Sequence, residues 1–239
     1  MNNKEILIEG LKKWDIEITD EKCSQFEIYK DLLLEWNKVM NLTAIEDERE
    51  VYIKHFLDSI SCIITGKINK GLSVIDVGTG AGFPSMPLKI MVPEIKLTLL
   101  DSLNKRLNFL RDVSEKAELD GIEYFHARAE DGGQNKAYRE KFDIAVSRAV
   151  ASLPVLLEYC LPFVKEGGYL ICQKGPALDD EIRDAKRSLE VLGGEIEEII
   201  KVDLPFTELD HRIAIIKKVK KTPKQYPRKA GKPSKEPIK

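Results

Sequence analysis

The sequence predicts an α/β fold with a mainly parallel, seven-stranded sheet and helices on both faces. From residue 73 onward, short apolar runs alternate with segments of helical periodicity, as expected for strands joined by crossover helices. The apolar run that begins at Val74 ends in Asp76 and passes into a turn with glycines at 78, 80 and 82. In folds of this class, ligands bind beyond the carboxyl ends of the strands, where this turn lies.

We divide the chain of 239 residues into a helical extension over 1–66, a sheet domain over 67–219 and a basic tail over 220–239. Apolar side chains in the extension recur at helical spacing in two stripes, and Asn41-Leu42-Thr43 ends the second helix. Another helix follows over about 48–65. We expect these helices to pack against the sheet domain.

The remaining elements follow in order along the chain. The later strands are predicted at 95–101, 122–127, 142–146, 169–172, 195–202 and 212–217. The helices between them are predicted from Pro84 onward and over about 103–120, 152–164 and 179–192. The pairs Gly167-Gly168 and Gly193-Gly194 are predicted to be turns.

Composition limits the class of protein. The chain is 43% hydrophobic and 33% charged, which is ordinary for a globular protein, and no run approaches the roughly 20 apolar residues of a membrane helix. The N-terminus lacks the apolar core of a signal peptide, so we expect a cytoplasmic protein. The four cysteines show neither C-x-x-C spacing nor a nearby histidine cluster, so no metal site is expected. Nothing in the sequence indicates an obligate protein partner.

Charge is distributed unevenly along the chain. Residues 217 to 239 hold ten Lys or Arg and one Glu, a net of +9, which leaves −11 for residues 1 to 216 because the whole chain carries −2. With four prolines and few apolar residues, this basic segment cannot bury a core. We expect a mobile tail whose partner is a polyanion.

The spacing of the glycines in the turn excludes two common kinds of nucleotide-binding site. A dinucleotide fingerprint would place its third glycine at position 83, which is Phe83, and no G-K-[ST] follows as in a phosphate-binding P-loop. The pattern is D-x-G-x-G-x-G from Asp76, and an acid before the first glycine suits a ligand that carries positive charge. The turn resembles the first motif of class I methyltransferases, which bind S-adenosylmethionine. This resemblance makes Asp76, Gly78 and Gly80 cofactor-site candidates.

Asp101 ends the second predicted strand, 25 residues after Asp76. Because the carboxyl ends of neighbouring parallel strands meet at one edge, we expect Asp101 beside the glycine turn, where it can accept both ribose hydroxyls. The alternative is that Asp101 or Ser102 caps the following helix. His55 and Asp58 share one helix face, either over the ligand cleft or in a local hydrogen bond with Ser59.

Several short motifs occur together in one order: Asn41-Leu42-Thr43-Ala44, His55-Phe56-Leu57-Asp58-Ser59, the glycine turn through Phe83-Pro84, Leu99-Leu100-Asp101-Ser102, Ala129-Glu130, Ser147-Arg148-Ala149 and Lys174-Gly175. Together they resemble the RsmG (GidB) family over about residues 26–219, and the tail from Tyr226 resembles its longer members. The resemblance implies a class I, Rossmann-like methyltransferase that acts on N7 of one guanosine in 16S rRNA, free or in the assembling small ribosomal subunit. One departure is Ser85, where the family usually has glycine.

By resemblance, cofactor contacts fall to Gly78, Phe83, Ala129, Glu130 and Arg148. We expect Phe83 to cover an apolar face of the ligand and Ala129-Glu130 to meet the adenine edges. Arg148 is alternatively a structural ion-pair partner of Asp76 or Glu130.

Guanine N7 carries no proton, so no catalytic base is assigned. The candidates for a role in the chemistry are His55, Asp58, Arg148 and Lys174. Two other functions stay open from the residues alone: a small-metabolite methyltransferase, or a non-catalytic protein that binds the cofactor and RNA.

Overall fold

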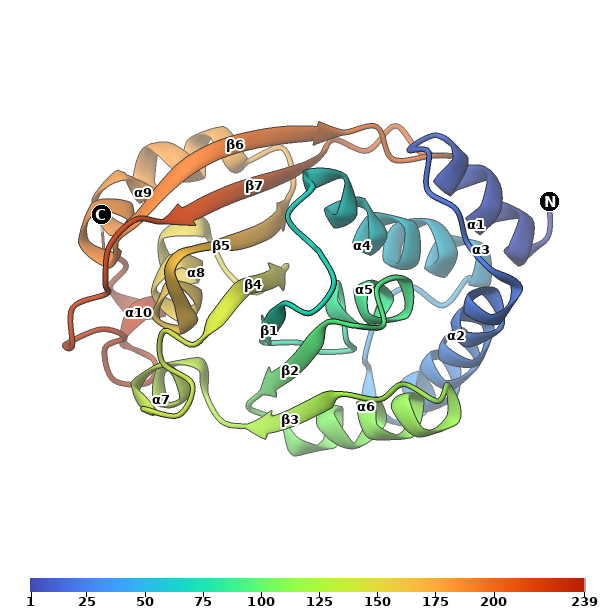
Figure 1. Ribbon diagram of the computed structural model, residues 1–239, viewed down its shortest axis with the longest axis horizontal. Helices are drawn as coiled ribbons and strands as arrows, with labels where there is room; N and C mark the ends of the chain where they lie inside the picture. The colour runs from blue at the N-terminus through green and yellow to red at the C-terminus, as the bar shows by residue number, and fades with distance from the viewer. Residues whose placement is uncertain (239) are drawn as a thin grey trace.

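The computed structural model describes residues 1–238 and contains a seven-stranded sheet in the order β3-β2-β1-β4-β5-β7-β6 (Figure 1). The five strands from β3 to β5 in this order run parallel, and β7 is antiparallel to both β5 and β6. The predicted α/β fold is therefore confirmed. The strands are β1 Ser73–Val77, β2 Lys96–Asp101, β3 Ile122–His126, β4 Phe142–Arg148, β5 Val164–Lys174, β6 Gly194–Val202 and β7 His211–Lys218.

Helices cover both faces of this sheet, as predicted. In Figure 1, α1, α2, α4, α5 and α6 lie on one side of it and α7, α8, α9 and α10 on the other. The helices are α1 Asn3–Lys12, α2 Asp20–Met40, α3 Glu48–Glu50, η1 Val51–Leu57, α4 Asp58–Ile60, η2 Ser61–Thr65, α5 Ser85–Met91, α6 Asn104–Lys116, α7 Ala129–Gln134, α8 Leu153–Cys160, η3 Leu161–Phe163, α9 Leu178–Leu192 and α10 Lys232–Lys235.

Two apolar clusters hold the layers together. One cluster joins the N-terminal helices, α5 and α6 to one face of the sheet, and the other joins α8 and α9 to the opposite face. Strand alternation explains the division, because Val74 of β1 belongs to the first cluster whereas Ile75 and Val77 belong to the second. Asp76 projects from the same face as Val74, toward the N-terminal helices.

The N-terminal extension packs directly against the glycine turn. The hydroxyl of Tyr29 in α2 donates a hydrogen bond to the carbonyl of Ala81 at 2.5 Å. A Cβ on Gly82, where φ is +95°, would lie 2.7 Å from Leu110, Met86 and the Tyr29 hydroxyl. The third glycine is therefore required by packing against α2, α5 and α6, rather than by a ligand.

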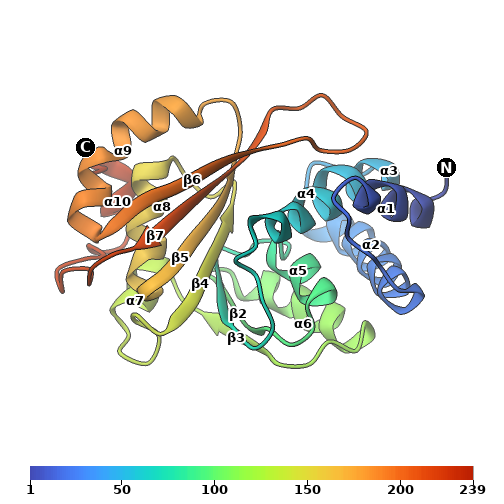
Figure 2. The same cartoon turned by 45° about the horizontal axis from the view of Figure 1, so that its top comes forward.

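The extension also meets the far edge of the sheet. The connection between β6 and β7 extends toward α3 and α1 (Figure 2), and the side chains of Lys13 and Arg49 lie 5.8 and 5.6 Å from the centre of the Phe206 ring. These contacts connect the loop between β6 and β7 to the N-terminal helices.

Several boundaries differ from the predicted ones. Gly167 and Gly168, predicted as a turn, lie within β5, beside a register irregularity against β4, with Gly167 at φ +84°. The polar residues Gln173 and Lys174 extend β5 beyond the apolar run because they pair with β7. The predicted helix over 152–164 ends in the 3₁₀ turn η3, which contains Pro162. Within the helix predicted over 48–65, residues Val51–Leu57 form a π-helix.

The C-terminal segment differs from the mobile tail that composition predicts, since residues 220–238 lie against the body of the protein. The guanidinium of Arg139 donates to the backbone carbonyls of Thr222, Pro223 and Tyr226 at 2.7–3.2 Å. Pro227 is buried, and its ring lies where a Cβ on Gly133 would be. Composition misses this arrangement because specific hydrogen bonds hold the segment, together with a few apolar contacts such as those of Tyr226 and Ile238 with the second cluster.

Candidate cofactor and substrate site

A cavity of about 610 Å³ opens at the carboxyl ends of β1, β2 and β4. Of the eleven candidate site residues predicted from the sequence, eight line it: His55, Gly78, Gly80, Phe83, Asp101, Ala129, Glu130 and Arg148. Asp58, Asp76 and Lys174 lie outside the lining. The cavity is also lined by Gly231 and Ser234, which sequence analysis did not connect with a ligand.

The glycine turn forms the floor of the cavity between β1 and β2. Backbone N–H groups of Gly78 and Thr79 both donate to the carbonyl of Leu100, at 2.9 and 3.0 Å, and tie the turn to the end of β2. Gly78 has φ +76°, and a Cβ there would lie 3.1 Å from the side chain of Val150 on the opposite rim. A side chain at this position would be strained and would narrow the cavity.

Asp101 lies beside the turn, as its position at the end of a neighbouring strand predicts. One carboxylate oxygen accepts a hydrogen bond from the N–H of Gly80 at 2.9 Å, and the other accepts from the N–H of Leu103 at 2.8 Å. Asp101 therefore ties the glycine turn to the residue that precedes α6 and also lines the cavity, while α6 begins without a side-chain cap. The oxygen that accepts from Gly80 also accepts from Arg106 Nη1 at 3.5 Å, so the other oxygen retains a lone pair for a ligand hydroxyl.

Asp76 is buried behind the turn and does not line the cavity, so the structure gives no support for a direct contact with the cofactor. Its Oδ2 accepts from the hydroxyls of Thr79 at 2.9 Å and Ser85 at 2.5 Å, whereas Oδ1 is buried without a hydrogen-bond partner among the described residues. Burial raises the pKa of Asp76 to about 7. Ser85, the departure from the family pattern, therefore has a local role as a donor to this buried carboxyl.

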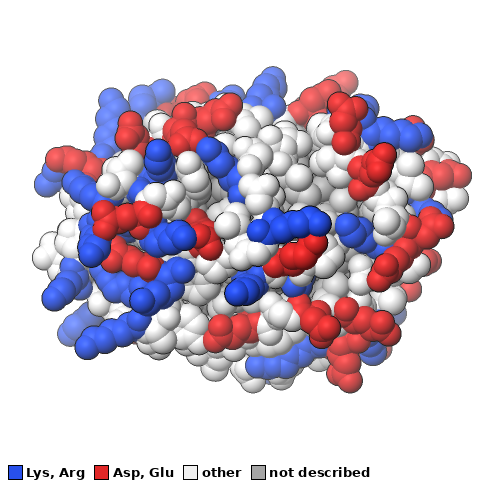
Figure 3. All heavy atoms as spheres, in the orientation of Figure 1, with Lys and Arg blue, Asp and Glu red and all other residues white. Residues whose placement is uncertain are grey.

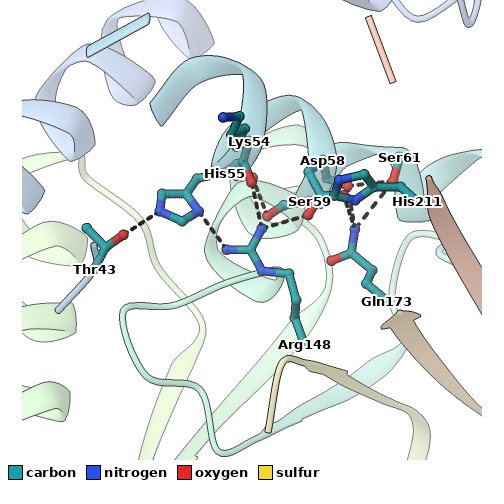
Figure 4. A network of polar contacts seen from close by, with 9 residues as sticks. All are labelled: Thr43, Lys54, His55, Asp58, Ser59, Ser61, Arg148, Gln173 and His211. Carbon is teal, nitrogen blue, oxygen red and sulfur yellow. Dashed lines mark hydrogen bonds and ion pairs between the residues drawn. The ribbon is translucent and has the colours of Figure 1, made fainter. Parts of the chain in front are cut away.

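Arg148, at the end of β4, is held by three acceptors from the N-terminal extension (Figure 4). Its Nη1 donates to Asp58 Oδ2 at 2.7 Å and to the carbonyl of Lys54 at 3.1 Å, and its Nη2 contacts His55 Nδ1 at 2.9 Å. The guanidinium carbon lies 4.7 Å from the centre of the Phe83 ring. The ion-pair partner of Arg148 is therefore Asp58, in place of the Asp76 or Glu130 considered from the sequence.

These contacts determine the protonation of His55. An arginine only donates, so Nδ1 of His55 must accept, and the ring proton lies on Nε2, from which it reaches Thr43 Oγ1 at 2.7 Å. Burial and the Arg148 charge lower the pKa of His55 to about 3. With both ring nitrogens engaged and the ring neutral, His55 is poorly placed to act as a general base.

Asp58 connects Arg148 to two residues that sequence analysis missed. Gln173 Nε2 donates to Asp58 Oδ1 at 3.1 Å and to its carbonyl at 2.6 Å, and His211 Nδ1 lies 3.0 Å from Oδ1 (Figure 4). Burial disfavours ionisation, yet the hydrogen bond from His211 and the charge of Arg148 outweigh it, and the pKa of Asp58 is lowered. The same hydrogen bond raises the pKa of His211.

Phe83 presents less surface to the cavity than expected. Its ring stacks on His55 with centroids 4.4 Å apart and on Tyr29 with centroids 5.4 Å apart, and only 7% of the residue is exposed. The aromatic ring therefore mainly fixes His55 and Arg148 against the N-terminal helices.

Ala129 and Glu130 begin α7 on the other side of the cavity. Glu130 Oε1 accepts a hydrogen bond from the N–H of Gly231 at 2.8 Å, so this carboxylate meets both the cavity and the C-terminal segment. Lys174 lies elsewhere, because its ammonium donates to the carbonyl of Ala151 and to Glu181, both at 2.6 Å. Its role as a candidate in the chemistry is therefore not supported.

Residues 1–238 contain no group of three or more His, Cys, Asp or Glu arranged to hold a metal ion. No helix in the same range is long and apolar enough to cross a bilayer.

Known proteins resemble this chain at two levels. Among solved structures, Methanococcus jannaschii fibrillarin pre-rRNA processing protein is 20% identical with a TM-score of 0.51, covering 66% of this chain and 73% of that one. Thermus thermophilus TrmN is 15% identical with a TM-score of 0.52, covering 70% and 53%. At these identities the likeness supports the fold alone.

Sequence relatives are much closer. The ribosomal RNA small subunit methyltransferase G of Alkaliphilus oremlandii is 61% identical and that of Alkaliphilus metalliredigens 54%, each over 239 residues and the full length of both chains. The family model described as "GidB: rRNA small subunit methyltransferase G" matches residues 22–209. These matches confirm the family predicted from the sequence motifs: the chain is a methyltransferase and belongs to the rRNA small subunit methyltransferase G family.

Proposed function

We propose that this protein transfers a methyl group from S-adenosylmethionine to N7 of one guanosine in 16S rRNA. The observation that carries the proposal is the 61% identity, from end to end, to a protein named ribosomal RNA small subunit methyltransferase G. An enzyme that modifies this RNA in bacteria works in the cytoplasm. Neither a small metabolite as substrate nor loss of activity is favoured by these relatives.

The cavity suits S-adenosylmethionine in size and in the chemistry of its lining. Asp101 Oδ1 has a free lone pair for a ribose hydroxyl, and Gly78 leaves room for close approach of the backbone. We expect Ala129 and Glu130, which line the cavity, to meet the adenine edges. When bound, the cofactor supplies an electrophilic methyl group on a sulfonium ion. Asp76 helps indirectly, because it holds Thr79 and Ser85 on either side of the turn.

The protein residues are suited to positioning rather than to proton transfer. Guanine N7 attacks through an in-plane lone pair and has no proton to lose, so alignment in a dry pocket can supply most of the catalysis. Neutral His55 and the Arg148 pair with Asp58 fit this requirement, since neither offers a free base. Asp58 also neutralises Arg148, which limits repulsion of the positive charge that N7 gains on methylation.

The surface beside the cavity suits an RNA backbone. Figure 3 shows Lys and Arg gathered on the side where α7, α10 and the C-terminal segment lie in Figure 1, whereas Asp and Glu crowd the side of α2 and α6. Lys224, Lys229 and Lys235 are exposed on this segment. Such a surface attracts phosphates and leaves the choice of base to the cavity.

The proposal is tested by incubating the protein with labelled S-adenosylmethionine and ribosomal RNA from a bacterial strain that lacks its own enzyme of this family. We expect label in the 16S RNA and, after nuclease digestion, 7-methylguanosine by mass spectrometry. Small ribosomal subunits from the same strain, used in parallel, show whether the RNA is modified free or assembled. Label confined to small molecules, or a different methylated nucleoside, would contradict the proposal.

A further inference from the structure

We propose that the C-terminal segment Tyr226 to Glu236 is part of the S-adenosylmethionine site. Gly231 and Ser234 are its binding residues, on the side of the cavity that Glu130 lines. Both residues line the cavity, although they follow Arg148, the cavity residue at the end of β4, by about 80 residues or more in the sequence. The inference rests on the proposed cofactor. It assigns a binding role to a segment that composition alone presents as a tail for polyanions.

A buried ion pair fixes the segment before it reaches the cavity. Arg228 meets Glu158 through Nε at 2.9 Å and Nη2 at 2.7 Å, and its backbone N–H donates to the same carboxylate at 2.8 Å. Glu158 is only 1% exposed, and it lies in α8, which the second apolar cluster holds against the sheet. A forked arginine on a buried carboxylate sets both the position and the direction of the chain.

Hydrogen bonds to α7 hold the preceding residues. Gln134 donates to the carbonyls of Lys224 and Pro227 at 3.2 and 2.8 Å. The helix that bears these donors begins at Ala129 and Glu130, which themselves line the cavity. The segment is therefore positioned by the same short helix that forms one side of the site.

Gly231 then joins the segment to the cavity lining. Its N–H donates to Glu130 Oε1 at 2.8 Å, and the Ser234 hydroxyl, one turn later, donates to the Gly231 carbonyl at 3.1 Å. Gly231 has φ +80°, which allows the chain to turn here and approach Glu130. Without this segment, Glu130 would lose a neutral donor and this side of the cavity would open to water. A ligand bound there would lose contacts and burial.

The test combines two variants and a control. Arg228→Ala removes the ion pair, and Ser234→Trp places a large ring in the lining from an exposed position where it need not disturb folding. Arg187→Ala removes a comparable arginine from an exposed pair on α9. Affinity for S-adenosylmethionine is measured by calorimetry, and amide exchange over 228–236 is followed by mass spectrometry with and without the cofactor.

We expect Arg228→Ala and Ser234→Trp to weaken cofactor binding at least about fivefold, with Arg187→Ala within about twofold of wild type. The cofactor should slow exchange over 228–236 in the wild-type protein. Suppose that the wild-type protein binds the cofactor, that folded Ser234→Trp binds it with the same affinity, and that the cofactor leaves exchange over 228–236 unchanged. These results would overturn the role of the C-terminal segment but not the proposed function. Absence of binding to the wild-type protein would overturn the proposed function and this assignment with it.

Discussion

Two buried carboxylates at the ends of neighbouring strands, Asp76 and Asp101, are distinguished by their partners. Asp101 is bonded to backbone N–H groups of Gly80 and Leu103 and reaches the cavity. One oxygen of Asp76 accepts hydrogen bonds from two hydroxyl groups, and the other has no hydrogen-bond partner within residues 1–238. We therefore propose that Asp101 contacts the ligand and that Asp76 supports the turn.

Replacing Asp101 with Ala should weaken S-adenosylmethionine binding by roughly 1–3 kcal/mol, because the ribose hydroxyls lose a charged acceptor. Calorimetry measures the affinity, and a melting curve shows whether the turn survives loss of the Gly80 hydrogen bond. Asp131→Ala, at an exposed position of α7, is the matched control. Affinity within twofold of wild type would rule out the ribose contact.

Asp76 should give the stability a characteristic pH dependence. Its folded pKa of about 7 exceeds the ordinary value of 3.8, so its contribution to stability is fully present below pH 3.8 and is lost as pH rises through 7. Asp76→Asn removes this titration. From pH 4 to 8 the free energy of unfolding of the variant should rise relative to wild type by about 2–4 kcal/mol. Urea unfolding across this range measures it, and parallel profiles would show that Asp76 does not titrate as described.

At the scale of elements, Arg148 and Asp58 connect four segments that are distant in the sequence. Arg148 ends β4, Asp58 begins α4, Gln173 lies in β5 and His211 begins β7 (Figure 4). Removing either member of the central pair would leave a buried charge without its partner, which is costly. The arrangement therefore holds the N-terminal extension to the strand ends that form the cavity.

Arg148→Lys keeps the charge but loses the planar fork that reaches His55 and Asp58 together. We expect the protein to fold and methyl transfer to fall at least about tenfold, equivalent to roughly 1.4 kcal/mol of transition-state stabilisation. Steady-state transfer to ribosomal RNA measures the effect, with Arg187→Lys on the surface of α9 as the control. If the lysine variant transfers methyl groups at the wild-type rate, only the charge of Arg148 matters and its planar fork does not.

The sequence predicts the parts of the site that follow from local rules. Parallel strands bring Asp101 to the glycine turn, and helical spacing brings His55 and Asp58 to one face, where both meet Arg148. Gln173 and His211 could not be found in this way, since their contacts with Asp58 span 115 and 153 positions and no motif marks them. The docking of residues 220–238 was missed because composition describes average burial and not specific donors such as Arg139.

At the scale of the whole molecule, the net charge of −2 conceals a separation of charge. Acidic side chains crowd the side of α2 and α6, and basic ones surround the C-terminal segment beside the cavity (Figure 3). An RNA would therefore approach along the basic side, with its target base directed toward the cavity.

Replacing Lys224, Lys229 and Lys235 together with Ala should weaken RNA binding and flatten its salt dependence. If all three contact phosphates, the slope of log affinity against log salt should fall by roughly 2–3 units. Filter binding at several salt concentrations measures the slope. The triple variant of Lys12, Lys38 and Lys116, exposed on the N-terminal helices and α6, is the control. Equal losses in both variants would indicate unspecific attraction rather than an RNA-binding side.

We propose that guanine N7 accepts the methyl group in the cavity. The most direct measurement compares methyl transfer to 16S transcripts made with guanosine and with 7-deazaguanosine, which has a carbon in place of N7. Both are incubated with labelled S-adenosylmethionine and assembled with small-subunit proteins where assembly is needed. We predict stoichiometric labelling of the guanosine transcript and no labelling of the 7-deaza transcript. Equal labelling of the two would show that an atom other than N7 carries the methyl group.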